Sequence, residues 1–404
     1  EVLKNFKYET IRSFYRDWYR PDLQAVIVVG DIEPEVAKKM ITDHFAALKN
    51  PAKERERKYV DVVPRKAPEA MVVTDKEATN SLLILTYPFV KDQDEVTVGD
   101  YRRQMIRSLG EQMLNRRLQE LAQGANPPFP YAGAGFDNMI HGYESFQAFA
   151  LMSSGDPAKA LNAVTAEFER AAKFGFNESE LELAKKDMMS GMEKSFNEKG
   201  TTDSKTYVEE YIRAFLNKEP FPGIANEYSY YKTYLPGITT ADVNSTVKQW
   251  FANKNTFTLI TAPDKADVKL PSDKELLAMT TKGFSQEITK TEEKVVASEL
   301  MAVKPTPGAG AAQMKDEGFG ATTYVLSNGI RVTIKPTDFK SDEILMNGVK
   351  KGGSNSYGVE DRSNVNFATD LVESMGLANF SPNDLEKILA GKKLEVTPSI
   401  GDIH

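Results

Sequence analysis

The alternation of apolar and polar residues near the start of the chain predicts a helix, a strand and a second helix. In residues 8–19, apolar side chains recur at i, i+3, i+4 and i+7, which places them on one helical face. Residues 23–29 (LQAVIVV) are almost continuously apolar and rich in β-branched side chains, as in a buried strand. Residues 33–48 again show helical spacing, with Pro34 in the first turn, where proline is tolerated.

This order of elements returns much later in the chain, over residues 239–264. When residues 16–19 (RDWY) are placed on residues 248–251 (KQWF), the only two tryptophans of the chain, at positions 18 and 250, coincide. One residue must be inserted after the tryptophan to align the strands that follow. Self-similarity of this kind is the signature of repeated structural units.

The sequence that ends with the second copy predicts one complete unit over residues 68–265. Its expected elements are strand material at 71–89, a helix at 98–121, a hairpin at 131–152, helices at 157–174 and 178–196, and then the repeated helix and strand. Strands interleaved with paired helices and joined by hairpins favour an α+β fold with a mostly antiparallel sheet packed against helices. Residues 1–64 are then the closing part of a first unit.

The character of the chain changes after the middle unit. Residues 266–320 are rich in Lys, Glu, Ser and Thr and include PTPGAGAA, so they predict a linker, with a short helix at 292–301. A third unit is expected over residues 321–404. It begins with a hairpin around the Asn-Gly pair at 328–329, followed by a strand at 343–349, a glycine-rich turn and a helix at 365–375.

The repeat also predicts that the chain is a fragment of a longer protein. Trp250 lies about 180 residues after the start of the middle unit, whereas Trp18 lies close to the start of the chain. A complete first unit would therefore need roughly 150 further residues before Glu1.

Composition and charge exclude several functional classes. The 404 residues are 41% hydrophobic with a formal net charge of −7, and Lys and Arg are dispersed, so a nucleic-acid partner is not expected. No run of about 20 apolar residues occurs, so no membrane span is expected. The chain has no cysteine, which excludes disulfides, thiolate metal sites and cysteine nucleophiles. Its three histidines are His44, His141 and His404.

Two segments carry a resemblance to a known family. Residues 14–35 (FYRDWYRPDLQAVIVVGDIEPE) resemble the segment that closes the first domain of pitrilysin/insulysin-type zinc metallopeptidases, the inverzincins. Residues 326–336 (LSNGIRVTIKP), with the glycine turn downstream, resemble the opening hairpin of such a domain. The resemblance implies two halves, each of two homologous α+β domains, that close around a peptide. This chain would hold the end of domain one, domain two, the linker between the halves and the start of domain three.

The zinc motif of that family, H-x-x-E-H, is absent from the chain. His44 is followed by FAAL, and His141 has a glutamate three residues on but Ser145 in place of the second histidine. In the third unit, residues 370–374 read DLVES, with Asp370 and Ser374 where the two histidines would stand. The resemblance therefore implies zinc in the parent protein with its ligands outside this segment, so no metal-binding or catalytic residue is assigned here.

The resemblance also suggests where a substrate would be contacted. The family places an arginine and a tyrosine near the scissile bond on its fourth domain. The equivalent stretch of the middle unit runs from Arg117 to Tyr131. These two residues are the candidate substrate-binding residues, and packing on a helix surface and in a turn is the alternative role.

The function expected from the sequence is therefore that of a segment of a bacterial zinc metalloendopeptidase, which hydrolyses peptides through a zinc-bound water. The segment would form chamber wall and scaffold and be inactive alone. The alternative is a non-catalytic paralogue, or a substrate-binding or structural partner subunit. Expected partners are a peptide substrate and a second peptidase half or a second copy. The periplasm or cell envelope is the expected location.

Overall fold

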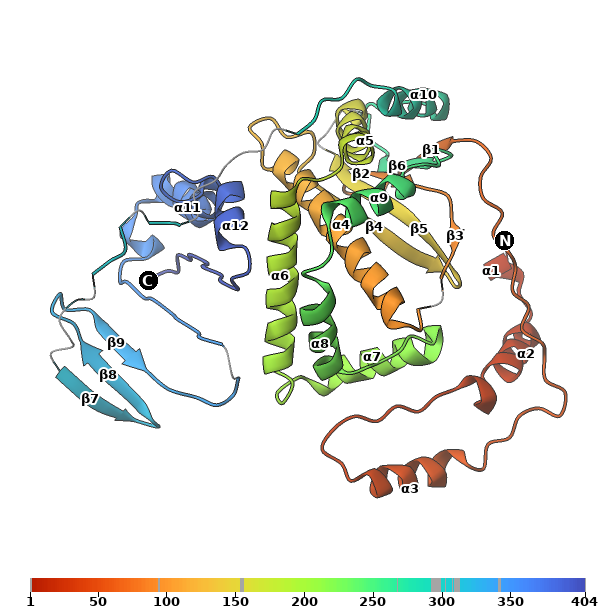
Figure 1. Cartoon of the computed structure of the whole chain (residues 1–404), viewed down its shortest axis with the longest axis horizontal. Coiled ribbons are helices and arrows are strands. Elements are labelled where there is room, and N and C mark those ends of the chain that lie inside the picture. The colour runs from red at the N-terminus through yellow and green to blue at the C-terminus, as the bar shows by residue number, and fades with distance from the viewer. Residues whose placement is uncertain are drawn as a thin grey trace.

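Figure 1 shows the computed structural model of the chain. It describes residues 2–93, 95–152, 156–266, 268–291, 299–301, 303–306, 308, 313–340 and 343–403. A central unit of helices on a sheet lies between an N-terminal arm on one side and a C-terminal unit on the other (Figure 1).

The central unit is built on one mixed, mostly antiparallel sheet. Its strands are β1 (Glu69–Asp75), β2 (Ser81–Thr86), β3 (Val90–Lys91), β4 (Tyr131–Ile140), β5 (Tyr143–Met152) and β6 (Phe257–Pro263). The order is β1-β6-β2-β5, and β3 and β4 also pair with β5. Only the β1–β6 pair of this sheet is parallel. The predicted α+β fold is confirmed.

Seven helices accompany this sheet among the described residues. They are α4 (Val98–Ala122), α5 (Pro157–Phe174), α6 (Glu178–Asn197), α7 (Ser204–Asn217), α8 (Ile224–Tyr234), α9 (Thr240–Trp250) and α10 (Asp273–Phe284). The core lies where α4 and α5 pack on the sheet, and Leu109, Leu114 and Phe168 are fully buried there. Capping boxes begin α4 at Thr97 and α6 at Asn177, and α6 confirms the helix predicted at 178–196.

The central unit continues past the boundary predicted at residue 265. Helix α10 lies inside the segment predicted as a linker, yet Leu276 is fully buried in the core. The Asp273 side chain also accepts a hydrogen bond from the Val72 amide of β1 at 2.7 Å. The segment was predicted as a linker because it is rich in Lys and Thr, although it contains a helix with one apolar face. Most of the short helix predicted at 292–301 lies outside the described residues.

The N-terminal arm contains the two predicted helices but not the predicted strand. It comprises α1 (Val2–Asn5), α2 (Tyr8–Trp18), η1 (Pro21–Leu23) and α3 (Pro34–Phe45). Residues 24–29 form no strand, so that prediction is wrong. A strand requires hydrogen-bonded neighbours, and none of the described strands lies beside this segment.

The C-terminal unit contains the predicted hairpin and helix. Its elements are β7 (Gln313–Gly318), β8 (Ala321–Val325), β9 (Arg331–Ile334), η2 (Ser354–Ser356), η3 (Val359–Asp361), α11 (Arg362–Met375) and α12 (Pro382–Leu389). The strand predicted at 343–349 is wrong, because the segment has no regular structure and Ile344 and Met346 are 93% and 92% exposed. Helix α12 was not predicted. Across the described ranges, no helix combines the length and hydropathy that a bilayer crossing needs.

Candidate functional site

A groove of about 690 Å³ lies between the central and C-terminal units. One wall is a face of α4 together with Asp187 of α6, and the other is α12 with the chain that follows it. The lining residues are Ser108, Glu111, Gln112, Asn115, Arg116, Gln119, Asp187, Leu385, Glu386, Leu389, Ala390, Lys392 and Leu394. Polar side chains therefore face a partly apolar wall.

The α4 wall carries groups that bond to peptide backbone. Asn115 donates to the Ala134 carbonyl at 2.7 Å and accepts from the Ala134 amide at 2.8 Å, as a neighbouring strand would. Glu111 accepts from the Phe136 amide at 3.3 Å. Burial raises the pKa of Glu111, against the opposing charge of Arg107. Strand β4, which pairs only with β5, thus has part of its backbone bonded by α4 side chains.

The α12 wall is tied to the central unit by charged contacts. Lys387 pairs with Glu120 at 2.8 Å. Asp187 accepts from the Gly391 amide at 2.7 Å and also pairs with Arg116 at 2.7 Å. These bonds hold the segment around α12 against α4 and α6. The groove therefore lies where ion pairs and a hydrogen bond join the two units.

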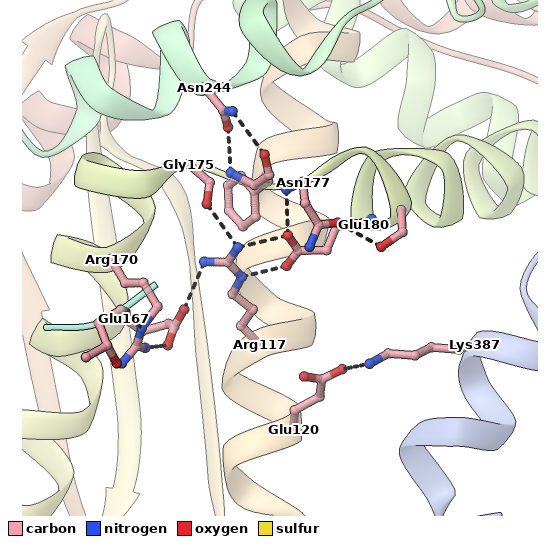
Figure 2. A network of polar contacts seen from close by, with 12 residues as sticks. Arg117, Glu120, Glu167, Arg170, Gly175, Asn177, Glu180, Asn244 and Lys387 are labelled. Carbon is pink, nitrogen blue, oxygen red and sulfur yellow. Dashed lines mark hydrogen bonds and ion pairs between the residues drawn. The ribbon is translucent and has the colours of Figure 1, made fainter. Parts of the chain in front are cut away.

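Arg117, the first candidate substrate residue, lies on the buried side of α4. Figure 2 shows its guanidinium between Glu180 of α6 and Glu167 of α5. It donates to both Glu180 oxygens at 2.6 and 2.9 Å, to Glu167 at 3.2 Å and to the Gly175 carbonyl at 3.0 Å. The guanidinium also stacks 4.4 Å from the centre of the Phe176 ring. Arg117 is only 6% exposed.

The electrostatics of Arg117 follow from this enclosure. Burial alone would lower its pKa, but the hydrogen bonds and charges of Glu180 and Glu167 outweigh burial and raise the pKa. The guanidinium is therefore held in its charged form, and its N–H groups donate hydrogen bonds to residues of the central unit.

Tyr131, the second candidate, has different surroundings. It begins β4, is 59% exposed, and its ring lies 5.6 Å from the ring of Phe149 on β5. Arg117 contacts α5 and α6, whereas Tyr131 contacts β5, so the structure does not gather the two residues around one point.

The two histidines that the structure describes and residues 370–374 lie on separate elements. The His44 ring lies 2.8 Å from the Met40 carbonyl on exposed α3, and His141 lies in the β4–β5 turn, 6.1 Å from the ring of Tyr59. Ser374 donates back to the Asp370 carbonyl, and His404 falls outside the described residues. Within the ranges that the structure covers, no three or more His, Cys, Asp or Glu form a group able to hold a metal.

The chain is similar to known peptidases in sequence. Residues 5–188 match the family described as Peptidase M16 inactive domain. A zinc protease PQQL-like protein of Arabidopsis thaliana is 25% identical over 96% of this chain and 38% of its own length. A probable zinc protease PqqL of Escherichia coli is 22% identical over 98% of this chain and 42% of its own length. The chain thus spans about two fifths of the length of the curated relatives it matches.

Solved structures share the fold. The first half of the periplasmic protease PqqL from Escherichia coli has a TM-score of 0.62 at 21% identity, covering 72% of this chain and 62% of that one. The ferredoxin protease FusC, solved in complex with Arabidopsis ferredoxin, has a TM-score of 0.58 at 20% identity, covering 96% of this chain and 43% of that one.

The resemblance to pitrilysin-type zinc metallopeptidases carried by the Trp18 segment and the Asn-Gly hairpin is therefore confirmed, because residues 5–188 match a domain of M16 peptidases and the sequence relatives are named as zinc proteases of the PqqL type.

Proposed function

We propose that the chain is a non-catalytic section of a PqqL-like zinc peptidase and forms the wall of its substrate chamber. The observation that carries the proposal is the match of residues 5–188 to the inactive domain of the family. The relatives are named zinc proteases, so the longer protein would be a hydrolase. Because the described residues do not fit zinc, the zinc ligands are proposed to lie elsewhere in the longer protein.

The groove between α4 and α12 is the proposed peptide-binding surface of this wall. Gln112 lies on the α4 wall, and its amide can supply both a donor and an acceptor to a peptide backbone. Asn115 is bonded to Ala134 and Gln119 donates to Glu386, so these two amides shape the wall instead. Leu385 and Leu389 on the facing wall offer apolar contact to peptide side chains. The groove can therefore hold an extended segment without selecting a strict sequence.

The two candidate residues receive different proposed roles. Tyr131 is exposed at the start of β4 and would extend the peptide-binding surface. Arg117 would not contact the peptide itself and would instead hold α4 in position, because its guanidinium is enclosed by Glu167 and Glu180. The periplasm is the proposed location, since the similar Escherichia coli protein is described as a periplasmic protease.

Peptide binding by the groove can be tested with fluorescein-labelled β-casein, an unfolded chain. The purified polypeptide should raise its fluorescence anisotropy without cleaving it. Gln112→Arg and Leu389→Asp should each weaken binding about tenfold, because each blocks one wall. Leu216→Asp, on the exposed face of α7, is the matched control and should bind normally. Equal affinity in all four proteins would contradict the groove.

The catalytic part of the proposal needs a separate measurement. Elemental analysis after dialysis should find essentially no zinc on the chain, and added zinc should not produce casein cleavage. Tightly held zinc or cleavage by the chain alone would overturn the assignment. A longer polypeptide that contains H-x-x-E-H and cleaves casein would support the peptidase, whereas one that lacks both would favour the non-catalytic paralogue.

A further inference from the structure

A second cavity, of about 140 Å³, lies at the start of α4, where α7 and α8 approach that helix (Figure 1). Among the described residues that line it are four glutamates and one cation, namely Glu95, Glu210, Glu219, Glu227 and Arg213. Arg213 lies 3.5 Å from Glu219, so this guanidinium already pairs with one of the four carboxylates. The side chains that line the cavity therefore leave it with an excess of negative charge.

Two of these carboxylates are partly withdrawn from water. Burial raises the pKa of Glu95, which accepts a hydrogen bond from Gln104. Burial also raises the pKa of Glu227, and the charge of Glu210 adds to this shift. A cation placed among such carboxylates is favourable, because an opposite charge at short range offsets both the burial and the mutual repulsion. The cavity thus favours a positively charged ligand.

The remaining walls of the cavity fit the side chain of a lysine or an arginine. They include the ring of Tyr101 and the ring of Pro220. A long basic side chain lays its apolar stem along surfaces of this kind while its charged end contacts acceptors, and an aromatic face also attracts a cation. A bare metal ion needs a closer set of ligands, and within the ranges that the structure covers no three acidic or histidine side chains provide one.

The cavity and the groove lie along the same face of α4. Tyr101 and Gln104 line the cavity, and Ser108 and Gln112 line the groove. Successive members of this set are three or four positions apart, which is the spacing of one helical face. Gln104 and Gln112 are separated by about 12 Å along the helix axis, a distance that an extended peptide covers with about four residues.

We propose that the cavity is a second subsite of the peptide-binding surface and receives a lysine or arginine side chain. That residue would lie about four positions from the apolar residue that contacts Leu385 and Leu389 in the groove. The inference rests on the proposed function of the groove and names the polypeptides that it prefers, which are extended segments with a basic and an apolar residue at this spacing. Glu95, Glu210 and Glu227 determine the preference, because they are the carboxylates that Arg213 does not pair with.

Three fluorescein-labelled peptides test the charge and the spacing by fluorescence anisotropy. KSGSLLSGSK has a lysine four positions from a leucine on either side, QSGSLLSGSQ replaces the lysines by glutamine, and SGSKLLKSGS has the composition of the first with the lysines beside the leucines. The first should bind the unmodified chain about tenfold more tightly than the second, and the third should lose most of that gain. Equal affinity for the two lysine peptides would overturn the proposal, because the gain would then come from the net charge of −7.

A double variant, Glu95→Gln with Glu210→Gln, tests the residues. It should abolish the preference for KSGSLLSGSK over QSGSLLSGSQ. Its matched control, Glu178→Gln with Glu182→Gln at the exposed start of α6, removes the same charge and should keep the preference. Thermal unfolding checks that both variants are folded. A preference that survives the first double variant would contradict the subsite.

The same peptides separate a failure of the subsite from a failure of the groove. If QSGSLLSGSQ binds, Leu389→Asp weakens its binding and the lysines add nothing, the groove stands and the subsite is wrong. If none of the three peptides binds, the proposed function of the groove is wrong and the subsite with it.

Discussion

The indole of Trp250 lies directly against the backbone of Gly110. A Cβ atom at position 110 would be 2.8 Å from the indole Cη2 and 2.8 Å from Val247 Cγ2. Helix α9 can approach α4 this closely only because position 110 has no side chain. The tryptophan on which the predicted internal repeat rests is thus the residue that fixes α9 onto α4, the longest helix of the central unit.

Gly110→Ala should therefore destabilise the central unit. The added methyl group overlaps two core side chains, and overpacking of this kind costs about 1–3 kcal/mol, which outweighs the gain of about 1 kcal/mol in helix propensity. The matched control is Gly191→Ala on α6, where no atom lies within 4 Å of the added Cβ. That control should stabilise the chain slightly. Urea unfolding of both variants measures the difference, and equal shifts would contradict the close contact.

Tyr87 should be replaceable by phenylalanine with a gain in stability. Its side chain is 2% exposed, and its hydroxyl has no hydrogen-bond partner among the described residues. Burial raises its pKa well above the usual value, so the neutral hydroxyl stays enclosed among aromatic rings. Removing an unpaired buried hydroxyl should add about 1 kcal/mol to the free energy of unfolding.

Tyr143→Phe is the matched comparison for Tyr87→Phe. The Tyr143 hydroxyl donates to Asp61 at 2.8 Å, so its loss should cost about 0.5–1 kcal/mol. Chemical unfolding of the two variants should give shifts of opposite sign. A loss of stability in Tyr87→Phe would show that its hydroxyl is in fact hydrogen-bonded.

Asp100 should make part of the stability dependent on pH in the acid range. Its carboxylate closes the capping box of α4, and hydrogen bonds from Thr97 and Val96, with Arg103 nearby, lower its pKa from 3.8 to about 2. A carboxyl with a lowered pKa contributes stability that is present above pH 3.8 and is lost as the pH falls through about 2.

Asp100→Asn should consequently be less stable than the unmodified chain at pH 7, with the difference shrinking as the pH approaches 2. Urea midpoints measured at several pH values test this. Glu35→Gln, in the exposed first turn of α3, forms no capping box and should show a small difference at every pH. If the difference in urea midpoint between Asp100→Asn and the unmodified chain stays constant from pH 7 to pH 2, the charge of Asp100 has no such role.

Local patterns predicted helices better than strands in this chain. The helices predicted over residues 8–19 and 178–196 follow from the spacing of apolar residues, which involves neighbours in sequence. Residues 24–29 and 343–349 have strand composition, but a strand also needs distant partners that no local pattern specifies. Helix α12 was missed although Ser381 and Asp384 form a capping box, because eight residues give little periodicity.

The candidate site was harder to predict than the fold, for a related reason. The amides at 112, 115 and 119 recur at helical spacing, a signal that was present in the sequence, but their facing wall comes from α12 in another unit. The surroundings of Arg117 are also non-local, since Glu167 and Glu180 are 50 and 63 residues away. Position on a helix could not show that this arginine faces inward.

The enclosure of Arg117 leads to the strongest expected loss of stability. Arg117→Met keeps most of the side-chain volume but leaves Glu167 and Glu180 without their shared cation, and breaking a buried ion pair costs about 3–5 kcal/mol. Arg103→Met, whose own side chain is 54% exposed beside Asp100, should cost far less. Adding Glu180→Gln to Arg117→Met should recover part of the loss, because it removes one uncompensated charge. Thermal and urea unfolding measure all three. Near-equal losses for positions 103 and 117 would show that Arg117 is solvent-accessible and free to contact a peptide.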